Sequence, residues 1–270
     1  MENNSLLDVQ HLSHMFYLKR KMTVKAIDDV SFQIKKGEIY GLVGESGSGK
    51  STVARCIMNI YKPSEGKIFY KGIPICKSKE FRKNRKMLQM TRQMIFQDSA
   101  SSLNPRMKIE DIVAEPLRIY SGKGRPGKKE IEKQLELVGL DRSYMEQYPC
   151  ELSGGQRQRV AIARALSTKP ELIVADEPIA SLDVSIQAQM VNLFRKLQKE
   201  QGFSFLFIAH DLSMVEFLCD RTGVMYHGKL VEEGRTQDIF AHPEHEYTKA
   251  LLAAVPIPDP RIERQKGEVL

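Results

Sequence analysis

The segment GESGSGKS, residues Gly44–Ser51, has the spacing Gly-x4-Gly-Lys-Ser and follows the apolar run Glu38–Val43. Glycines at these intervals let successive backbone N–H groups turn toward phosphate oxygens, and a helix behind them adds the positive end of its dipole. The following run, Ser51–Ile60, has a helical pattern that stops before a proline. Strand, glycine-rich loop and helix together predict a nucleotide site, in which Lys50 contacts the β and γ phosphates and the Ser51 hydroxyl binds magnesium.

The composition fits one large α/β domain with a smaller subdomain, because the chain has 270 residues, 41% hydrophobic and 28% charged. Its four cysteines lie too far apart for a metal site or a disulfide framework, so reduced thiols are expected. The apolar stretch Ala250–Val255 is too short for a membrane span of roughly 20 residues. No secretory signal is visible, and a cytoplasmic location is expected. The net charge of +7 suits nucleic acid, anionic headgroups or a nucleotide without choosing among them.

A second apolar run, Leu172–Ala175, ends in the carboxylates Asp176 and Glu177. In nucleotide hydrolases a strand-end aspartate holds magnesium, and a second carboxylate activates the attacking water. Capping of the next element is the alternative for both side chains. Because these carboxylates follow a phosphate loop in the same chain, the catalytic interpretation is favoured.

Two more strand-like runs end in polar side chains. Phe205–Ala209 is followed by His210, and Gln93–Gln97 ends on Gln97, which is expected near magnesium or the attacking water. An amphipathic helix, Ile186–Gln201, separates two of the strands, and the order strand, helix, strand predicts a parallel sheet with crossover helices.

The segment Leu152-Ser153-Gly154-Gly155-Gln156 places a second glycine pair at the start of a helix, with Ser153 as its N-cap. Such a helix start is a second anion site. Since one nucleotide already fills the first loop, this segment is predicted to bind the nucleotide of another copy or of a partner. A plain turn before a helix is the alternative.

The rest of the chain divides by pattern into strand-rich and helical parts. From 99 to 150 the pattern is helical and polar, without a convincing strand, which predicts a helical subdomain inserted into the α/β core. The other expected elements are strands at Leu7–Leu12, Val30–Ile34 and Ile68–Tyr70, a basic turn at Lys19–Lys21, a helix at Gln156–Leu166 and a hairpin around Gly228 within Val224–Val231.

In this combination and order, the motifs resemble the ATP-binding cassette of ABC transporters, a family of ATP hydrolases. The resemblance implies a P-loop NTPase fold of the RecA-like α/β type, with an antiparallel β subdomain and an inserted α-helical subdomain. It also implies binding of ATP and Mg²⁺. The nucleotide-binding residues implied are Gly44, Glu45, Ser46, Gly47, Ser48, Gly49, Lys50, Ser51 and Thr52 in the loop, Ser153, Gly154, Gly155 and Gln156 in the signature segment, and Asp183.

The resemblance also assigns chemical roles. Glu177 is implied as the catalytic base, His210 as the switch histidine and Gln97 as the Q-loop glutamine, with Lys50 on the phosphates. The implied magnesium residues are Ser51, Gln97 and Asp176. The family stacks an upstream aromatic on adenine, for which Phe16 is the first choice and Tyr17 the second.

The implied division of the chain has four parts. Residues 1–97 hold the first part of the ATP-binding core with the β subdomain, and residues 98–153 form the helical subdomain. Residues 154–240 complete the core, and residues 241–270 form a C-terminal tail typical of the narrower family.

Narrower motifs are similar to the ATPase subunits of bacterial oligopeptide and dipeptide importers, whose relatives carry nickel or metal-opine complexes. These motifs are Ile95–Asp98 with Ser102–Met107, Asp183–Gln189, and Tyr247–Leu252 with Val255-Pro256. Ser99 and the pair Ala180-Ser181 depart from the usual family residues, and the cysteine-rich tail of many relatives is absent from this sequence. Peptide uptake is therefore the leading prediction, with nickel or metal-opine uptake as the alternative.

The resemblance implies a membrane-docked machine at the cytoplasmic face of the cell membrane. Its expected partners are a homologous ATPase subunit or a second copy, two integral-membrane permease subunits and, indirectly, an extracytoplasmic solute-binding protein. A soluble ABC ATPase acting on nucleic acid is less favoured, because the residues between Gln97 and Ser153 contain no sustained heptads. A metabolic kinase would not account for Leu152–Gln156. No nucleic-acid partner is therefore expected.

Overall fold

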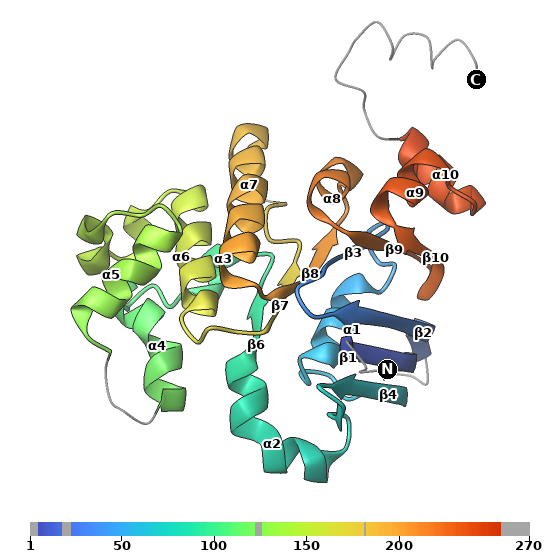
Figure 1. The fold of residues 1–270 in the computed structure, drawn as a ribbon, viewed down its shortest axis with the longest axis horizontal. Coiled ribbons are helices and arrows are strands. Elements are labelled where there is room, and N and C mark those ends of the chain that lie inside the picture. The colour runs from blue at the N-terminus through green and yellow to red at the C-terminus, as the bar shows by residue number, and fades with distance from the viewer. Residues whose placement is uncertain (1–4, 18–22, 122–125, 181, 255–270) are drawn as a thin grey trace, which may run out of the picture.

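The computed structural model describes residues 5–17, 23–121, 126–180 and 182–254, and it contains two β-sheets (Figure 1). The larger sheet has the strand order β10-β9-β3-β8-β7-β6, with β9, β3, β8, β7 and β6 parallel and β10 antiparallel to β9. The smaller sheet, in the order β2-β1-β4-β5, is antiparallel. The strands are β1 (Ser5–Tyr17), β2 (Thr23–Lys35), β3 (Ile39–Val43), β4 (Glu65–Tyr70), β5 (Ile73–Pro74), β6 (Arg92–Ile95), β7 (Leu172–Asp176), β8 (Ser204–Ala209), β9 (Arg221–Tyr226) and β10 (Lys229–Arg235).

The larger sheet is buried on both faces, and alternating side chains of its strands enter two different cores. In β8, Phe205 and Phe207 face one core, whereas Leu206 and Ile208 face the other. Successive side chains of a strand point to opposite faces, so a strand covered on both sides is apolar throughout. This double burial explains why β3, β7 and β8 are uninterrupted apolar runs in the sequence.

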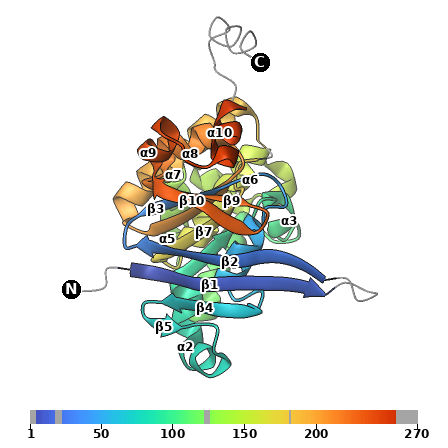
Figure 2. The same ribbon diagram turned by 90° about the vertical axis from the view of Figure 1, so that its right-hand side faces the viewer.

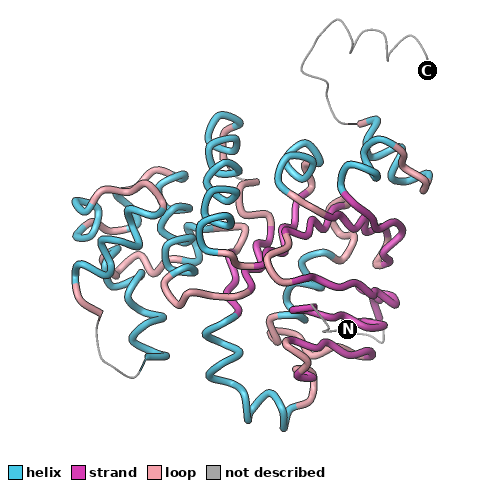
Figure 3. The backbone as a smooth tube through the Cα atoms, viewed as in Figure 1, coloured by secondary structure: helices cyan, strands magenta, loops and turns pink. Residues whose placement is uncertain are grey.

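Helices cover one face of the larger sheet, and the smaller sheet with α1 covers the other (Figure 2). Beside the sheet, α3, α4 and α5 pack against α6 and form a helical region (Figure 3). The α-helices are α1 (Lys50–Ile57), α2 (Ser78–Thr91), α3 (Ser99–Ser102), α4 (Ile109–Ser121), α5 (Lys128–Leu137), α6 (Gly154–Leu166), α7 (Val184–Gln201), α8 (Leu212–Leu218), α9 (Thr236–Ala241) and α10 (Glu246–Ala253), with 3₁₀ turns η1 (Arg142–Glu146) and η2 (Pro149–Glu151).

The predicted architecture is confirmed: an α/β core, an antiparallel β subdomain and an inserted helical region. Between 99 and 151, the described residues contain helices and no strand. The predicted boundary between 153 and 154 separates α6 from the helices it packs against, although α6 also contacts β6. The four-part division of the chain remains a prediction.

Several predicted boundaries were wrong. Strand β6 ends at Ile95, so Gln97 lies in the following loop, and α1 ends at Ile57 rather than Ile60. The basic stretch before β6 proved to be a helix, α2; Leu88 is its one buried residue, which leaves the helical period faint in the sequence. The predicted hairpin around Gly228 is confirmed as β9 and β10. The turn at Lys19–Lys21, Ser181 and the pair Val255-Pro256 lie outside the described residues.

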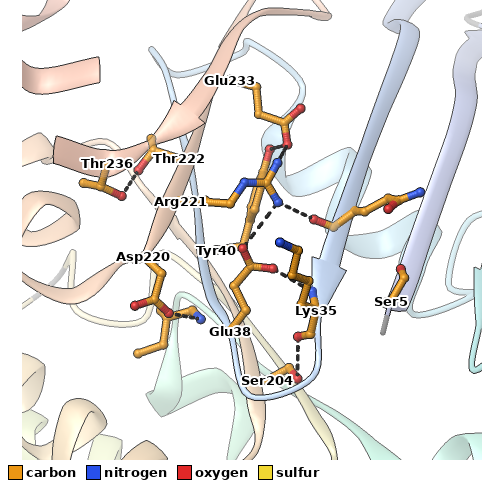
Figure 4. A network of polar contacts seen from close by, with 12 residues as sticks. Ser5, Lys35, Glu38, Tyr40, Ser204, Asp220, Arg221, Thr222, Glu233 and Thr236 are labelled. Atoms are coloured by element: carbon orange, nitrogen blue, oxygen red, sulfur yellow. Dashed lines mark hydrogen bonds and ion pairs between the residues drawn. The ribbon is translucent and has the colours of Figure 1, made fainter. Parts of the chain in front are cut away.

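A partly buried polar network holds the strand that leads into the glycine-rich loop (Figure 4). Arg221, at the start of β9, donates to Glu233 on β10 at 2.6 Å and to Glu38, just before β3, at 3.3 Å. The Tyr40 hydroxyl on β3 donates to the same Glu233 oxygen at 3.0 Å, and burial raises the pKa of Tyr40 well above its usual value. The network therefore ties β3, β9 and β10 together at the end opposite the loop.

No helix in the described part of the chain combines the length and the apolar character that a membrane crossing requires.

Candidate functional site

The phosphate loop, Gly44–Thr52, is pressed between two strands, and two of its glycines are required by that position. A Cβ on Gly44 would lie 2.1 Å from the Met225 carbonyl oxygen at the end of β9, and a Cβ on Gly49 would lie 2.4 Å from the Ala26 carbonyl oxygen on β2. Their φ angles of 144° and 105° are also unfavourable for other residues. The shape of the loop therefore depends on close packing against the backbones of β9 and β2 as well as on its own residues.

Lys50 is the first residue of α1 and folds back over the loop. Its ammonium donates to the carbonyl oxygens of Gly44 at 2.6 Å and Glu45 at 2.7 Å, and the residue is 3% exposed. Burial lowers the pKa of Lys50, while the nearby carboxylates of Glu177 and Asp176 oppose that change. The amine thus lies at the start of a helix, where anions are favoured, and its three donors let it contact phosphate while it keeps the Gly44 carbonyl contact.

Ser51 and Asp176 meet between α1 and the carboxyl end of β7. The Ser51 hydroxyl donates to a carboxylate oxygen of Asp176 at 2.7 Å. Burial raises the pKa of Asp176, and the Ser51 hydrogen bond opposes the rise. Hydroxyl and carboxylate oxygens suit Mg²⁺, which typically takes one or two protein ligands together with phosphates and water. The described residues include no cluster of three or more His, Cys, Asp or Glu side chains able to hold a metal alone, so this donor pair fits Mg²⁺ that arrives with a nucleotide.

Glu177, Gln97 and His210 come together at the carboxyl edge of the sheet. Gln97 Nε2 donates to Glu177 Oε2 at 3.0 Å, and His210 Nδ1 lies 3.5 Å from the same oxygen. Glu177 has a left-handed backbone with φ of 47°, an unfavourable conformation for glutamate that concentrates at functional sites. One carboxylate oxygen is thus oriented by two neighbours beside a cavity of about 20 Å³, as a general base requires.

The grouping of these side chains follows from strand order. Strands β6, β7 and β8 are parallel neighbours, so their carboxyl ends lie at one edge of the sheet. The structure therefore brings Gln97, Glu177 and His210 together as the sequence predicted, even though Gln97 lies beyond its strand. Their catalytic roles remain a prediction.

The signature segment, Leu152–Gln156, lies apart from this group. Ser153 caps α6: its hydroxyl accepts from the Gln156 N–H at 3.3 Å, and the Gln156 side chain accepts from the Ser153 N–H at 2.8 Å. A Cβ on Gly155 would lie 3.0 Å from Ile186 in the first turn of α7, next to the exposed N-cap residue Asp183. In Figure 1, α6 lies to the left of α7 and α1 to its right.

The predicted adenine-stacking residues lie at the end of β1. The Phe16 ring packs edge-on against His14 and Tyr61, with ring centroids 4.7 Å and 5.4 Å away. Tyr17, the second choice, is 77% exposed. These contacts and exposures do not choose between the two rings, and the adenine-stacking role remains a prediction.

One contact of the phosphate loop was missed in the sequence. The Glu45 N–H donates to the hydroxyl of Tyr247, in the first turn of α10, at 2.9 Å. Tyr247 opens the segment Tyr247–Leu252, one of the motifs similar to the ATPase subunits of oligopeptide and dipeptide importers. No local pattern could have predicted the contact, because it joins residues 202 positions apart.

Comparison with known proteins shows the family of the chain. The model of the ABC transporter family matches residues 27–180, and the model of the oligopeptide/dipeptide transporter C-terminal region matches residues 231–270. The chain is 52% identical over 269 residues to the oligopeptide transport ATP-binding protein OppF of Bacillus subtilis, covering 97% of this chain and 86% of that protein. It is 51% identical over 268 residues to OppF of Streptococcus mutans, covering 97% and 85%.

Among solved structures, the chain resembles the ATP-binding cassette MJ0796, determined as a dimer in a post-hydrolysis state bound to ADP and Pi. The TM-score is 0.76 at 28% sequence identity, and the match covers 85% of this chain and 98% of that one.

Proposed function

The chain belongs to the ATPase subunits of oligopeptide and dipeptide ABC transporters, and we propose that it hydrolyses MgATP as one half of a cassette pair. Each nucleotide would lie between the phosphate loop of one chain and the signature segment of the other. The observation that carries this proposal is that the predicted nucleotide-binding residues lie in two separate parts of the fold. Lys50, Asp176 and Glu177 gather around the phosphate loop, whereas the signature segment packs against the start of α7.

Two further observations support the pairing. Asp183 and Val184, beside the signature segment, are exposed, and Val184 is 81% exposed although it is apolar. Val184 and the 50% exposed Phe217 line one cavity of about 350 Å³, and an exposed apolar patch suits a surface that a second cassette covers. The MJ0796 cassette, which the chain resembles, is dimeric with ADP and Pi bound.

The proposed reaction is attack of water on the γ-phosphorus of ATP. Lys50 and the loop N–H groups bind the β and γ phosphates, and Ser51 and Asp176 would hold Mg²⁺, which would neutralise phosphate charge when bound. Glu177 accepts a proton from the water while the water oxygen bonds to the γ-phosphorus. The bond between the γ-phosphorus and the ADP oxygen breaks in the same step. Gln97 and His210 hold the accepting oxygen of Glu177 in place.

We place the contact with a permease in the groove lined by α2, β6 and α4, a cavity of about 470 Å³. Three apolar side chains on its wall are exposed: Ile60 by 52%, Phe96 by 38% and Ile119 by 64%. Phe96 is adjacent to Gln97, whose side chain donates to Glu177. A cytoplasmic segment of an integral-membrane permease bound in this groove would contact Phe96, the residue next to Gln97. Movement of the segment would then reach the Gln97–Glu177 hydrogen bond and couple transport to hydrolysis.

The same proposal includes the other subunits of the transporter. The second cassette is a homologous subunit or another copy of this chain, two permease subunits bind the pair at the cytoplasmic face of the membrane, and a solute-binding protein delivers peptides from outside.

An Ile119→Asp variant should lose copurification with the permeases while ATP binding by the chain is retained. Val24→Asp is the matched control for copurification, because it charges an exposed apolar side chain on β2, outside the groove. Equal effects of both variants would contradict the placement.

The test of the shared site compares two variants. Lys50→Ala should abolish ATP binding by the isolated chain, whereas Gly154→Asp should leave that binding intact and stop hydrolysis in the assembled transporter. Gly127→Asp, at the start of α5, is the control for the glycine-to-aspartate change. Loss of ATP binding by the isolated Gly154→Asp chain would contradict a site shared between chains.

A further inference from the structure

We infer that Tyr247 of α10 is a positioning residue of the phosphate loop, so that helix α10 contributes to the affinity of the chain for ATP. This inference rests on the proposed function, since it concerns the same nucleotide site. It begins with the hydrogen bond at 2.9 Å from the Glu45 N–H to the Tyr247 hydroxyl.

This hydrogen bond holds one side of a peptide group whose other side is held by Lys50. The Gly44 carbonyl and the Glu45 N–H belong to the same planar peptide unit and point in opposite directions. The carbonyl accepts from Lys50 Nζ at 2.6 Å, and the N–H donates to Tyr247 at 2.9 Å. Rotation of this peptide would break both contacts. Tyr247 therefore fixes the orientation of the peptide on which the Lys50 ammonium rests.

Tyr247 can act in this way because its ring is itself fixed. The ring stacks on Tyr226, the last residue of β9, with centroids 4.0 Å apart and an interplanar angle of 27°. The residue before Tyr226 is Met225, whose carbonyl oxygen closely approaches Gly44. Strand β9 and helix α10 thus hold adjacent points of the loop, one through backbone packing and the other through a hydroxyl.

The start of α10 is anchored to β10 through Glu232. The carboxylate of Glu232 accepts from the Glu244 N–H at 2.9 Å and from the His245 N–H at 3.1 Å. The His245 ring then accepts from the Tyr247 N–H at 3.1 Å and caps the helix. The next strand residue, Glu233, belongs to the polar network of Figure 4. A continuous set of contacts therefore connects the core of the larger sheet, α10 and the phosphate loop.

The expected consequence concerns nucleotide affinity. A preorganised loop binds phosphate more tightly than one whose N–H groups must be oriented during binding. A net hydrogen bond contributes about 0.5–1.5 kcal/mol, so loss of the Tyr247 hydroxyl should weaken ATP binding roughly 3- to 10-fold. Because the Tyr247 ring would still stack on Tyr226, the fold should be little affected.

The test compares Tyr247→Phe with Tyr226→Phe in the full chain, with ATP as the probe. Tyr247→Phe should raise the Kd for ATP roughly 3- to 10-fold, and in the assembled transporter it should raise KM for ATP with little change in kcat. Tyr226→Phe keeps the stack and the Glu45 contact, so its Kd should match the wild type. Melting temperatures serve as the measure of any general loss of stability.

An ATP affinity of Tyr247→Phe equal to that of the wild type, or an equal loss in both variants, would overturn the inference. Lys50→Ala is measured alongside as the test of the loop assignment itself. If Lys50→Ala loses ATP binding and Tyr247→Phe does not, the positioning role fails and the nucleotide site stands. If Lys50→Ala keeps full ATP binding, the proposed function fails instead.

Discussion

Replacement of Glu177 by glutamine removes the proposed proton acceptor and keeps the shape of the site. Gln97 Nε2 donates to Glu177 Oε2, and the amide oxygen of a glutamine at position 177 could accept the same bond. The contacts of Lys50 and Ser51 do not involve Glu177 directly. The variant should therefore fold normally and bind ATP at least as tightly, because one negative charge near the phosphates is removed.

The size of the expected effect follows from the role of the base. General base catalysis contributes typically about 10²- to 10⁴-fold, equal to about 3–5 kcal/mol in activation free energy. The kcat of the Glu177→Gln transporter should fall by that factor. Because ATP would bind without being hydrolysed, the cassette pair should accumulate in a closed, ATP-bound form that is visible by size-exclusion chromatography.

The same strand offers a matched control. Glu171 lies just before the amino end of β7 and pairs with Lys71 at 2.7 Å, whereas Glu177 lies just beyond the carboxyl end. Glu171→Gln should leave ATPase activity unchanged, because this half-exposed side chain lies at the end of β7 opposite the site. Turnover by Glu177→Gln within tenfold of the wild type, or a similar loss in Glu171→Gln, would refute the assignment of Glu177 as the base.

Two further predictions concern stability. Arg221→Met should cost about 1–3 kcal/mol near pH 8, measured by urea unfolding, because it leaves the partly buried Glu233 carboxylate without its cationic partner. Burial already raises the pKa of Glu233, and Arg221 opposes the rise. Without Arg221, Glu233 in the folded state would bind a proton more readily than in the unfolded state. The loss of stability in the variant should therefore shrink toward pH 5 and grow as the pH rises through the pKa of Glu233 in the folded variant. An equal deficit at both pH values would contradict this account. Gly49→Ala should lower the melting temperature and ATP affinity far more than Gly47→Ala, since a Cβ at Gly49 meets the Ala26 carbonyl at 2.4 Å, whereas a Cβ at Gly47 meets nothing within 4 Å. Gly47→Ala should cost only the left-handed strain of about 1–2 kcal/mol, and similar losses in the two variants would argue against the packing of the loop on β2.

The predictions from sequence succeeded where function depends on local order along the chain. The spacing of Gly44–Ser51 places a lysine and a serine at a helix start whatever surrounds them. Asp176, Glu177 and His210 could be grouped because parallel strands end at one edge of a sheet. Continuous apolar runs such as Leu172–Ala175 predict buried strands, because both faces of such a strand need apolar side chains.

The sequence by itself therefore determined the family, the phosphate loop and the strand-end residues, whereas the tertiary structure decided which distant groups hold that loop. Helix α2 has one buried residue, so its period is faint in the sequence. Tyr247 reaches Glu45 across 202 positions, and Arg221 meets Glu38 across 183. Such contacts depend on how β9, β10 and α10 return to β3, and the return is set by the packing of the whole sheet rather than by any local pattern.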